Sequence, residues 1–376
     1  MLFYRNLDNI IFHRNELFRC DELVVLSGYV GPHPVHMLKD LPLKTTVIYG
    51  MYGSEGIQRS LHSALIQENQ ALDNVDILYS SMPVHAKCYI WKNRGEVVHA
   101  LVGSANFSTN GLTTPYKEVL AETTMDTFDP LDQYLSMVLR GAISCEDAVV
   151  KNNRKKSREA ITNDGAYDPD VCSMPLYIVE NGREVVPTSS GINWGMAKLT
   201  GSHVNINDAY IRIGKDLLEH YPLLFPPKQR EPSEGEDVVR RDHRHNDSIE
   251  IIWDDGTSMT GLLEGSVTKT DENGQKVLYP KQVSTTPRKA ILGKYLRERM
   301  GIPEGRAITI TDFERYGRKT IDVSLQGEGI YYFDFSVGES YQAVSATPQY
   351  SLNQMSLDMV AEEQVSYGGD HDQDNN

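Results

Sequence analysis

The apolar residues of the first 150 positions fall into short continuous runs separated by segments of helical periodicity. The runs predicted to be strands are 21–30, 45–52 and 76–79. Apolar residues recur at helical spacing over 57–70 and again over 129–142. Strands that alternate with helices predict an α/β domain, a mixed sheet with flanking helices.

The pattern changes after residue 174, where short strands follow one another with little helix between them. The predicted strands are 176–179, 209–213, 248–253, 258–263, 307–310, 320–325 and 330–335. A hairpin turn is indicated at Asp254-Asp255-Gly256-Thr257, and one helix at 288–300, closed by Gly301. Residues 174–338 therefore predict a mostly β domain of seven strands, a sandwich or small barrel.

Two polar segments flank this second domain. Residues 151–173 are charged and without periodicity, which is typical of a linker. Residues 339–376 are rich in Gln, Ser and Asp and end in Gly-Gly-Asp-His-Asp-Gln-Asp-Asn-Asn, so we expect an acidic, disordered tail. The expected organisation is a domain at 1–150, a linker, a domain at 174–338 and the tail.

The formal net charge of −15 argues weakly against a nucleic-acid partner, so the distribution of charge matters. Residues 1–150 hold 11 Lys and Arg against 17 Asp and Glu, a net −6. Residues 281–319 hold ten bases against four acids, a net +6, which is enough to bind a polyanion locally. The four cysteines lack paired spacing, and the start of the chain lacks a signal peptide, so a cytoplasmic protein with free thiols is expected.

One stretch of the first domain contains the candidate catalytic residues. Residues 83–107 read PVHAKCYIWKNRGEVVHALVGSANF, two apolar runs joined by a turn at Asn93-Arg94-Gly95. On a strand that includes both residues, His85 and Lys87 project from the same face, and the next strand ends in Gly103-Ser104-Ala105-Asn106. A nucleophile, a cation and hydrogen-bond donors without metal-ligand spacing suit phosphoryl transfer.

These residues resemble the active-site signature of the phospholipase D (PLD) superfamily, in particular its restriction endonucleases of the NgoFVII-like group. The resemblance rests on His85-x-Lys87 followed by Gly103-Ser104-x-Asn106. It implies that His85 attacks phosphorus and forms a phosphohistidine, that Lys87 neutralises the phosphoryl oxygens, and that Ser104 and Asn106 donate hydrogen bonds. The aspartate that ends the signature in lipid-acting members is not evident after Lys87.

A nucleophilic imidazole is usually held in one tautomer by a carboxylate. The family places an acid shortly after the Gly-Ser-x-Asn loop, and the candidates are Glu118 and Glu122. We prefer Glu118, because it opens an apolar strand as in the family pattern.

A single His-x-Lys unit supplies no second histidine to protonate the leaving oxygen. The resemblance implies that two identical subunits supply it together, so we predict a homodimer through the N-terminal domain. It also implies that no metal or other cofactor is required. Enzymes of this architecture often act with a helicase-like ATPase and a cognate DNA methyltransferase.

The second domain resembles the plant B-three-like pseudobarrel, a DNA-recognition domain that also occurs in restriction enzymes. The resemblance rests on two loops, 190–211 and 311–319, and on the Lys281–Thr286 segment between them. The loop 196–204 has no arginine, which departs from the family pattern. The residues implied in DNA binding are Asn193, Trp194, Lys198, Ser202, His203, Asn205, Asn207, Asp208, Arg212, Lys281, Gln282, Ser284, Thr285, Arg315, Tyr316, Gly317, Arg318 and Lys319.

Together these features favour a sequence-specific, metal-independent restriction endonuclease that acts on double-stranded DNA, with no membrane partner. Two alternatives stay open. A lipid phosphodiesterase would use the same histidine and lysine, but has no need of a second domain with basic loops. A DNA-binding regulator would use the first domain only to dimerise. Cleavage of plasmid DNA in EDTA separates the three.

Overall fold

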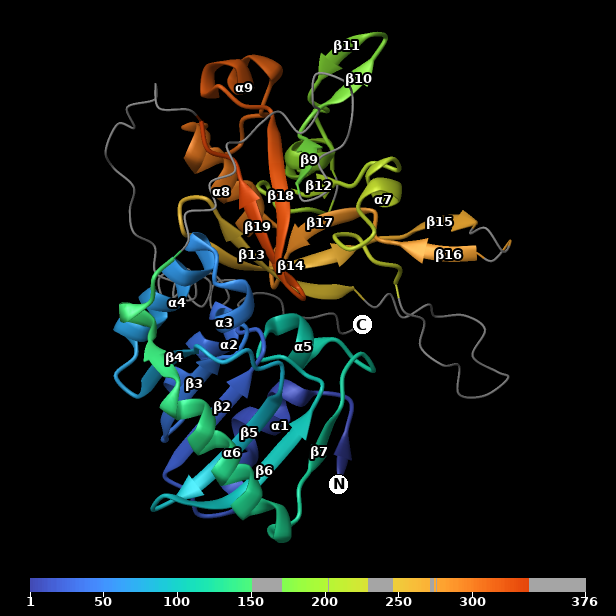
Figure 1. Ribbon diagram of the computed structural model, residues 1–376. Coiled ribbons are helices and arrows are strands. Elements are labelled where there is room, and N and C mark those ends of the chain that lie inside the picture. Colours follow the sequence, from blue (N-terminus) through green and yellow to red (C-terminus); the bar gives the residue numbers. More distant parts are fainter. Residues whose placement is uncertain (151–170, 202, 229–245, 271–273, 275, 338–376) are drawn as a thin grey trace, which may run out of the picture. The chain divides into compact units, whose positions relative to one another are not determined.

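The computed structural model describes residues 1–150, 171–201, 203–228, 246–270, 274 and 276–337 (Figure 1). Residues Met1–Ser336 form one compact unit that holds both domains. Most of the expected linker, the tail from 339 and Ser202 lie outside the described residues.

The N-terminal domain is built on an eight-stranded mixed sheet (Figure 1). Its strand order is β1-β7-β6-β5-β2-β3-β4-β8, with parallel pairs β2–β3 and β3–β4 and antiparallel pairs elsewhere. The strands are β1 (Leu2–Phe3), β2 (Glu22–Ser27), β3 (Lys44–Tyr49), β4 (Val75–Ser80), β5 (Lys87–Asn93), β6 (Glu96–Gly103), β7 (Leu120–Glu122) and β8 (Ala142–Ser144).

Helices cover both faces of this sheet. They are α1 (Leu7–His13), α2 (Pro32–Met37), α3 (Tyr52–Glu55), α4 (Arg59–Ala71), α5 (Thr109–Thr113) and α6 (Phe128–Arg140). In β2, Val24 and Leu26 pack in one core with Leu135 and Val138 of α6. Leu23 and Val25 point to the other core, which the remaining helices complete. Because both faces are buried, the sequence of β2 is continuously apolar rather than alternating.

The C-terminal domain is a seven-stranded sheet that curls until its edge strands β12 and β9 lie near each other, which makes it barrel-like. The strand order is β12-β17-β14-β13-β19-β18-β9. The strands are β9 (Cys172–Pro175), β12 (Ile211–Arg212), β13 (Asp247–Trp253), β14 (Ser258–Glu264), β17 (Gln282–Thr285), β18 (Thr320–Gly327) and β19 (Ile330–Asp334).

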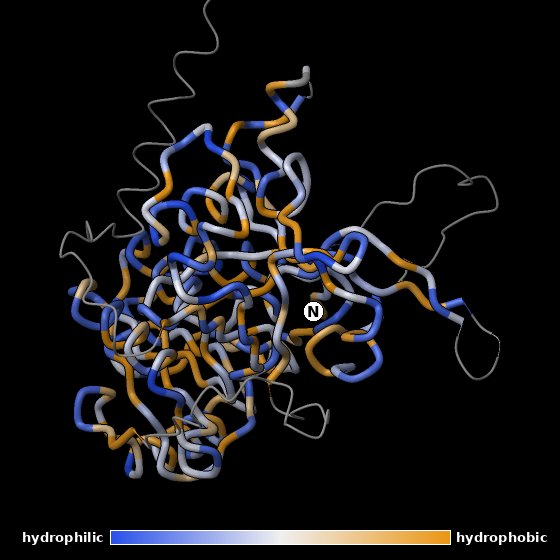
Figure 2. Tube along the Cα trace, turned by 90° about the horizontal axis from the view of Figure 1, so that it is seen from above, coloured by the Kyte–Doolittle hydropathy of each residue, from blue (hydrophilic) through white to orange (hydrophobic). Residues whose placement is uncertain are grey.

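Two hairpins and three α-helices of the described residues lie outside the seven-stranded sheet. The hairpins are β10 (Ile178–Glu180) with β11 (Arg183–Val185), and β15 (Val267–Thr270) with β16 (Lys276–Tyr279), which projects from the sheet (Figure 1). The helices are α7 (Leu217–His220), α8 (Ala290–Met300) and α9 (Ile310–Tyr316). Apolar stretches run through the interior of the molecule, and the peripheral loops are mostly polar (Figure 2).

The predicted fold class is confirmed, an α/β domain followed by a seven-stranded barrel-like domain, but some elements were wrong. The predicted strand 307–310 does not form, because Thr309 and Asp312 make a capping box that starts α9. The supposed basic loop 311–319 is therefore mostly helix. Strands β9 and β17 were missed and complete the seven. None of the described helices is long and apolar enough to cross a membrane.

Candidate active site

His85 and Lys87 meet at the start of β5. The predicted strand began too early: β5 starts at Lys87, because the preceding segment bonds elsewhere, with the Val84 N–H donating to the Gly50 carbonyl (2.9 Å). The two side chains still converge. The Lys87 ammonium lies 2.9 Å from His85 Nδ1 and donates to the His85 carbonyl at 2.7 Å. The His85 side chain is exposed, whereas Lys87 is buried.

Asn106 approaches His85 from the loop after β6, across the small residue Gly28 at the end of β2. A Cβ added to Gly28 would lie 3.2 Å from His85 Cδ2 and 3.5 Å from Asn106 Oδ1. Asn106 is buried, and its Oδ1 accepts a hydrogen bond from the Tyr29 N–H (3.2 Å). The Tyr29 ring stands edge-on to the His85 ring, with centroids 5.9 Å apart. Three chain segments thus meet around Gly28.

Ser104 and Glu118 complete the cluster. Ser104 Oγ accepts from the Val119 N–H at 3.1 Å and hydrogen-bonds Glu118. Burial raises the pKa of Glu118, and the bond to Ser104 opposes that shift. Burial lowers the pKa of Lys87, and the negative charge of Glu118 partly offsets it. The hydrogen bonds described for the His85 ring come from Lys87, so the tautomer-holding role suggested for Glu118 stays a prediction.

The alternative acid lies in a different cluster. Glu122 sits 3.1 Å from Arg14 and 3.5 Å from His99 Nδ1, and Arg14 also bonds the His99 ring at 2.9 Å. Its carboxylate is therefore engaged away from His85, and of the two candidates it is Glu118 that lies with Ser104 and Lys87.

Three supporting residues were not foreseen in the sequence. Ser27 Oγ donates to the Tyr29 carbonyl (2.6 Å) and accepts from the Phe107 N–H (2.9 Å), which ties the end of β2 to the Asn106 loop. The Tyr89 hydroxyl donates to the Ala105 carbonyl (2.9 Å) in the same loop. Gly28 leaves the room in which His85 and Asn106 meet. The available signal was the pair of small residues ending a buried strand, Ser27-Gly28.

Comparison with known proteins agrees with this architecture. Residues 5–152 match the model of the NgoFVII restriction endonuclease N-terminal PLD domain, and residues 170–326 match that of the NgoFVII C-terminal B3-like DNA-binding domain. The chain belongs to the NgoFVII restriction endonuclease family. No curated protein matches it.

Similar solved structures include NucT from Helicobacter pylori, with 18% sequence identity and a TM-score of 0.31, covering 38% of this chain and 97% of NucT. Nuc, a phospholipase D family member from Salmonella typhimurium, is 12% identical with a TM-score of 0.24, covering 33% of this chain and 81% of that one. The polyphosphate kinase of Porphyromonas gingivalis is 11% identical with a TM-score of 0.27, covering 40% of this chain and 24% of the kinase. Likenesses this weak carry no argument about function.

In the B3-like domain of this NgoFVII family member, six of the residues predicted to bind DNA have buried side chains, and their contact with DNA stays a prediction. Asn193 is fully buried and bonds the backbone of Pro187 and Ile308 at 2.8–3.0 Å. The Tyr316 hydroxyl donates to the Phe335 carbonyl at 2.8 Å. The six are Asn193, Asn207, Asp208, Ser284, Thr285 and Tyr316.

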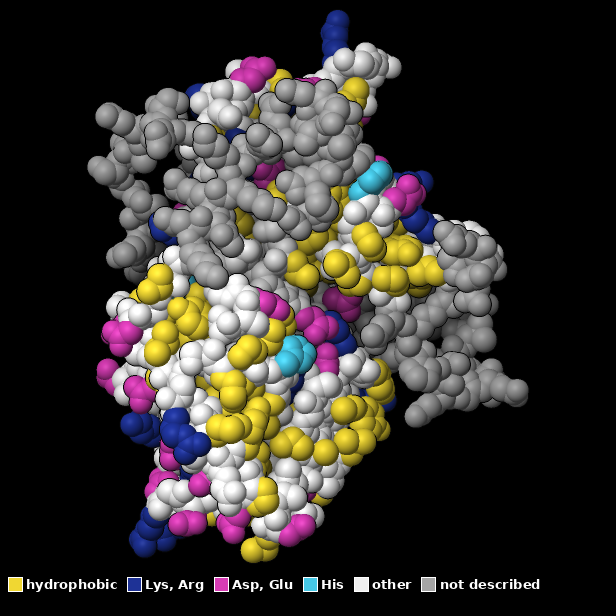
Figure 3. Space-filling view, viewed as in Figure 1, with side chains coloured by type: hydrophobic (Ala, Val, Ile, Leu, Met, Phe, Trp, Pro, Cys, Tyr) yellow, Lys and Arg dark blue, Asp and Glu magenta, His cyan; other side chains and the backbone are white. Residues whose placement is uncertain are grey.

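Two of the predicted basic residues, both partly buried, are also neutralised within the domain, and the more exposed Arg315 lies 3.2 Å from Asp312. Arg318 lies 2.8 Å from both Asp322 and Asp334, and Lys319 lies 2.5 Å from Glu184. Their charge is therefore largely balanced locally. On the face shown in Figure 3, the described Lys and Arg side chains are scattered and form no continuous patch.

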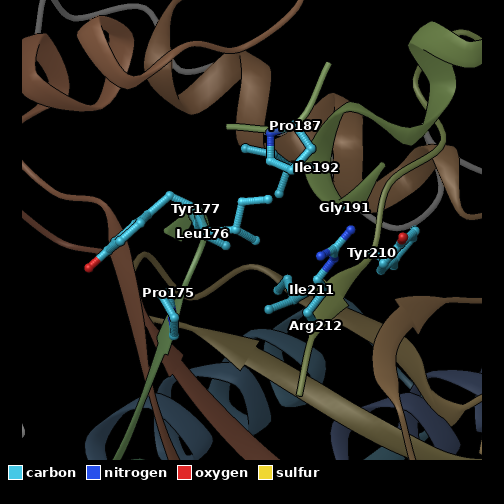
Figure 4. A pocket seen from close by; sticks show the side chains of 10 residues that line it. Pro175, Leu176, Tyr177, Pro187, Gly191, Ile192, Tyr210, Ile211 and Arg212 are labelled. Atoms are coloured by element: carbon cyan, nitrogen blue, oxygen red, sulfur yellow. The ribbon is translucent and has the colours of Figure 1, made fainter. Parts of the chain in front are cut away.

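The remaining predicted residues are exposed or partly exposed, and they stay candidates for DNA contact. They are Trp194, Lys198, His203, Asn205, Arg212, Lys281, Gln282, Arg315 and Gly317. The Lys289 ammonium lies over the Trp194 ring, 4.9 Å from the ring centroid. A cavity of about 20 Å³ lies beside Arg212, between β9 and β12 (Figure 4). It has room for about one water molecule and is too small for a base.

Proposed function

We propose that this chain is a sequence-specific, metal-independent restriction endonuclease that hydrolyses DNA phosphodiesters through a covalent phosphohistidine. The observation that carries the proposal is the convergence of His85, Lys87 and Asn106 around Gly28. An exposed imidazole beside a buried ammonium and an amide is suited to attack on a phosphodiester, because both neighbours can stabilise negative charge on the phosphoryl oxygens.

The reaction proceeds in two displacements. In the first, an imidazole nitrogen of His85 forms a bond to phosphorus, the bond from phosphorus to one deoxyribose oxygen breaks, and that oxygen takes a proton from a second imidazole. In the second, water attacks phosphorus and gives its proton to the second imidazole. The nitrogen–phosphorus bond breaks, and its electron pair returns to His85.

Lys87 and Asn106 act on the charge that develops in these steps. Lys87 is nearly buried and positively charged, so its attraction to the phosphoryl oxygens is screened less than that of an exposed lysine. Asn106 Oδ1 is held by the Tyr29 N–H, which leaves the amide Nδ2 as the donor for substrate. Ser104, directly after β6, and Glu118, shortly before β7, support this pair.

The second imidazole is the partner subunit's His85. The contacts described for the His85 ring are with Lys87 and Tyr29 and include no second histidine. A homodimer through the N-terminal domain supplies an identical residue by two-fold symmetry. A helicase-like ATPase and a cognate methyltransferase are the further partners we propose, in the cytoplasm.

The test is cleavage of supercoiled plasmid DNA in EDTA by the wild type and by His85→Ala. We expect the wild type to cut at defined sequences and the variant to lose cleavage while keeping DNA binding. Binding without cleavage by the wild type, with the ATPase partner added, would favour a non-catalytic regulator. Cleavage that returns only with Mg²⁺ would contradict the metal-free mechanism.

A further inference from the structure

A carboxylate from the barrel is inserted between the two loops that form the nuclease site. Glu250 lies on β13 and is 1% exposed. Its Oε1 accepts from the Thr109 N–H at 2.7 Å, and its Oε2 accepts from the His33 N–H at 3.1 Å. Both N–H groups belong to the N-terminal domain, so a single side chain of the DNA-binding domain bonds two separate segments of the nuclease.

The two segments that Glu250 bonds are continuations of the active-site loops. Thr109 is the first residue of α5, three positions after Asn106, and His33 lies in the first turn of α2, five positions after Gly28. The loops are already joined to each other by the Gly31 N–H, which donates to the Phe107 carbonyl at 2.9 Å. Glu250 therefore fixes both loops from outside, at the point where each becomes a helix.

Beside Gly31 there is space for the Glu250 carboxylate but not for a larger side chain at position 31. A Cβ on Gly31 would lie 1.9 Å from Glu250 Oε1, so any larger residue there must displace the carboxylate. The backbone around Glu250 is fixed in its own sheet, where its N–H donates to the Gly329 carbonyl at 2.8 Å. A second bond between the domains lies alongside, from Asn110 Nδ2 to the Ser248 carbonyl at 2.8 Å.

The chemistry of the contact requires a carboxylate rather than a space-filling side chain. Two backbone donors face two oxygens, and the buried negative charge lies at the N-terminal ends of two helical segments. A glutamine in the same place offers one oxygen and one NH₂ group, so one of the two N–H donors loses its acceptor. An apolar residue leaves both donors unpaired.

We propose that Glu250 is a positioning residue of the nuclease site, contributed by the DNA-binding domain, which holds the loops of Gly28 and Asn106 in the geometry for attack by His85. The inference rests on the proposed function. It makes the catalytic geometry depend on docking of the barrel, so recognition and cleavage share one structural link. Glu250 touches no reacting atom, but it positions the loops beside the reacting groups. Its loss therefore affects the chemical step more than the binding of DNA.

The experiment compares the full chain with Glu250→Gln and Gly31→Ala in single-turnover cleavage at pH 8, in EDTA and with enzyme saturating. We expect both variants to cleave about tenfold more slowly or worse, because a small displacement of Asn106 raises the barrier, while the Kd for DNA changes less than twofold. Gly31→Ala keeps the carboxylate and displaces it, which separates position from charge.

The matched control is Asp254→Asn, which changes a nearly buried carboxylate that directly follows the same strand. Asp254 bonds Arg299 and accepts from the Phe335 N–H at 2.9 Å, both inside the barrel. We expect the Asp254→Asn variant to cleave DNA at the wild-type rate. Hydrogen exchange gives a readout that needs no cleavage: at least one of the Thr109 and His33 amides should exchange faster in Glu250→Gln, and neither should in Asp254→Asn.

The outcomes separate the two levels of the argument. Wild-type chain that does not cut DNA contradicts the proposed function and the inference with it. Wild-type chain that cuts, with Glu250→Gln within twofold of it, leaves the proposed function standing and overturns the inference. Equal losses in Asp254→Asn and Glu250→Gln would assign the effect to general stability and also overturn the inference.

Discussion

The hydrogen bond of the Tyr89 hydroxyl can be used to test what positions the loop that contains Asn106. Tyr89 is fully buried on β5, two residues after Lys87, and its hydroxyl donates to the Ala105 carbonyl at 2.9 Å. Tyr89→Phe removes this one oxygen and keeps the ring, which packs against Phe107 with centroids 6.1 Å apart. The Ala105 carbonyl then loses its described donor, beside the Asn106 amide.

Tyr89→Phe should lower the free energy of unfolding by about 1–3 kcal/mol, because this is the cost of leaving a buried acceptor without a donor. The loop can lower this cost by moving its carbonyl toward water, and this movement carries Asn106 with it. If about 1.4 kcal/mol is lost from the positioning of Asn106 in the transition state, the cleavage rate falls about tenfold. Urea unfolding measures the first quantity, and single-turnover cleavage measures the second.

Tyr331→Phe is the matched control. Tyr331 is also buried, and its hydroxyl donates to the Leu224 carbonyl at 2.6 Å within the barrel. We expect the same loss of unfolding free energy but wild-type cleavage. Equal cleavage by both variants, with the stability loss present in both, would refute the idea that Tyr89 acts through the Asn106 loop.

Three further predictions follow from individual contacts. Ser27→Ala removes two bonds, to the Tyr29 carbonyl and from the Phe107 N–H, and should cost about 2–4 kcal/mol of unfolding free energy in urea; a loss below 0.5 kcal/mol, on the scale of an ordinary surface change, would contradict it. Burial raises the pKa of Glu250 to about 7, so the folded chain keeps a proton that the unfolded chain releases near 4.5. Stability should therefore fall by about 3 kcal/mol as pH rises from about 4.5 to about 7, a slope that Glu250→Gln should remove in urea titrations across that range. Lys198→Ala removes an exposed charge and should weaken binding of all DNA sequences alike, with the salt slope reduced by about 1; a sequence-dependent loss would instead indicate a base contact.

The sequence predicts the central strands of the nuclease domain well, because their signal is local, but it does not predict the short edge strands β1 and β8. Both faces of β2 and β3 are covered, so their apolar runs are unbroken and bounded by polar turns. The turn before Gly95 is equally local, with positive φ angles at Arg94 and Gly95. The exact start of β5 could not be predicted, because it depends on the Val84 bond to Gly50, a residue 34 positions away.

The barrel is less predictable because its polar residues pair over long distances. Residues 281–319 carry a net charge of +6, yet Arg299 pairs with Asp254 and Lys319 with Glu184. A count along the chain cannot reveal such partners, so it overstates the positive charge that the segment leaves unpaired. Helix α9, which starts at the capping box of Thr309 and Asp312, was not predicted from the sequence.

The candidate active site shows what a motif can and cannot specify. His85, Lys87, Ser104, Asn106 and Glu118 are near in sequence and are brought to one cluster. The residues that hold this cluster come from elsewhere, from the end of β2 and from β13 of the other domain, and no local pattern marks them as related.

The most direct test of the central claim is a search for the covalent intermediate. The full chain is mixed with cognate duplex DNA in EDTA, quenched in alkali within one turnover, digested and examined by mass spectrometry. We expect a nucleotide attached through phosphorus to His85, absent from the His85→Ala variant. DNA cut in one turnover with no such adduct, or with the adduct on another residue, would contradict it.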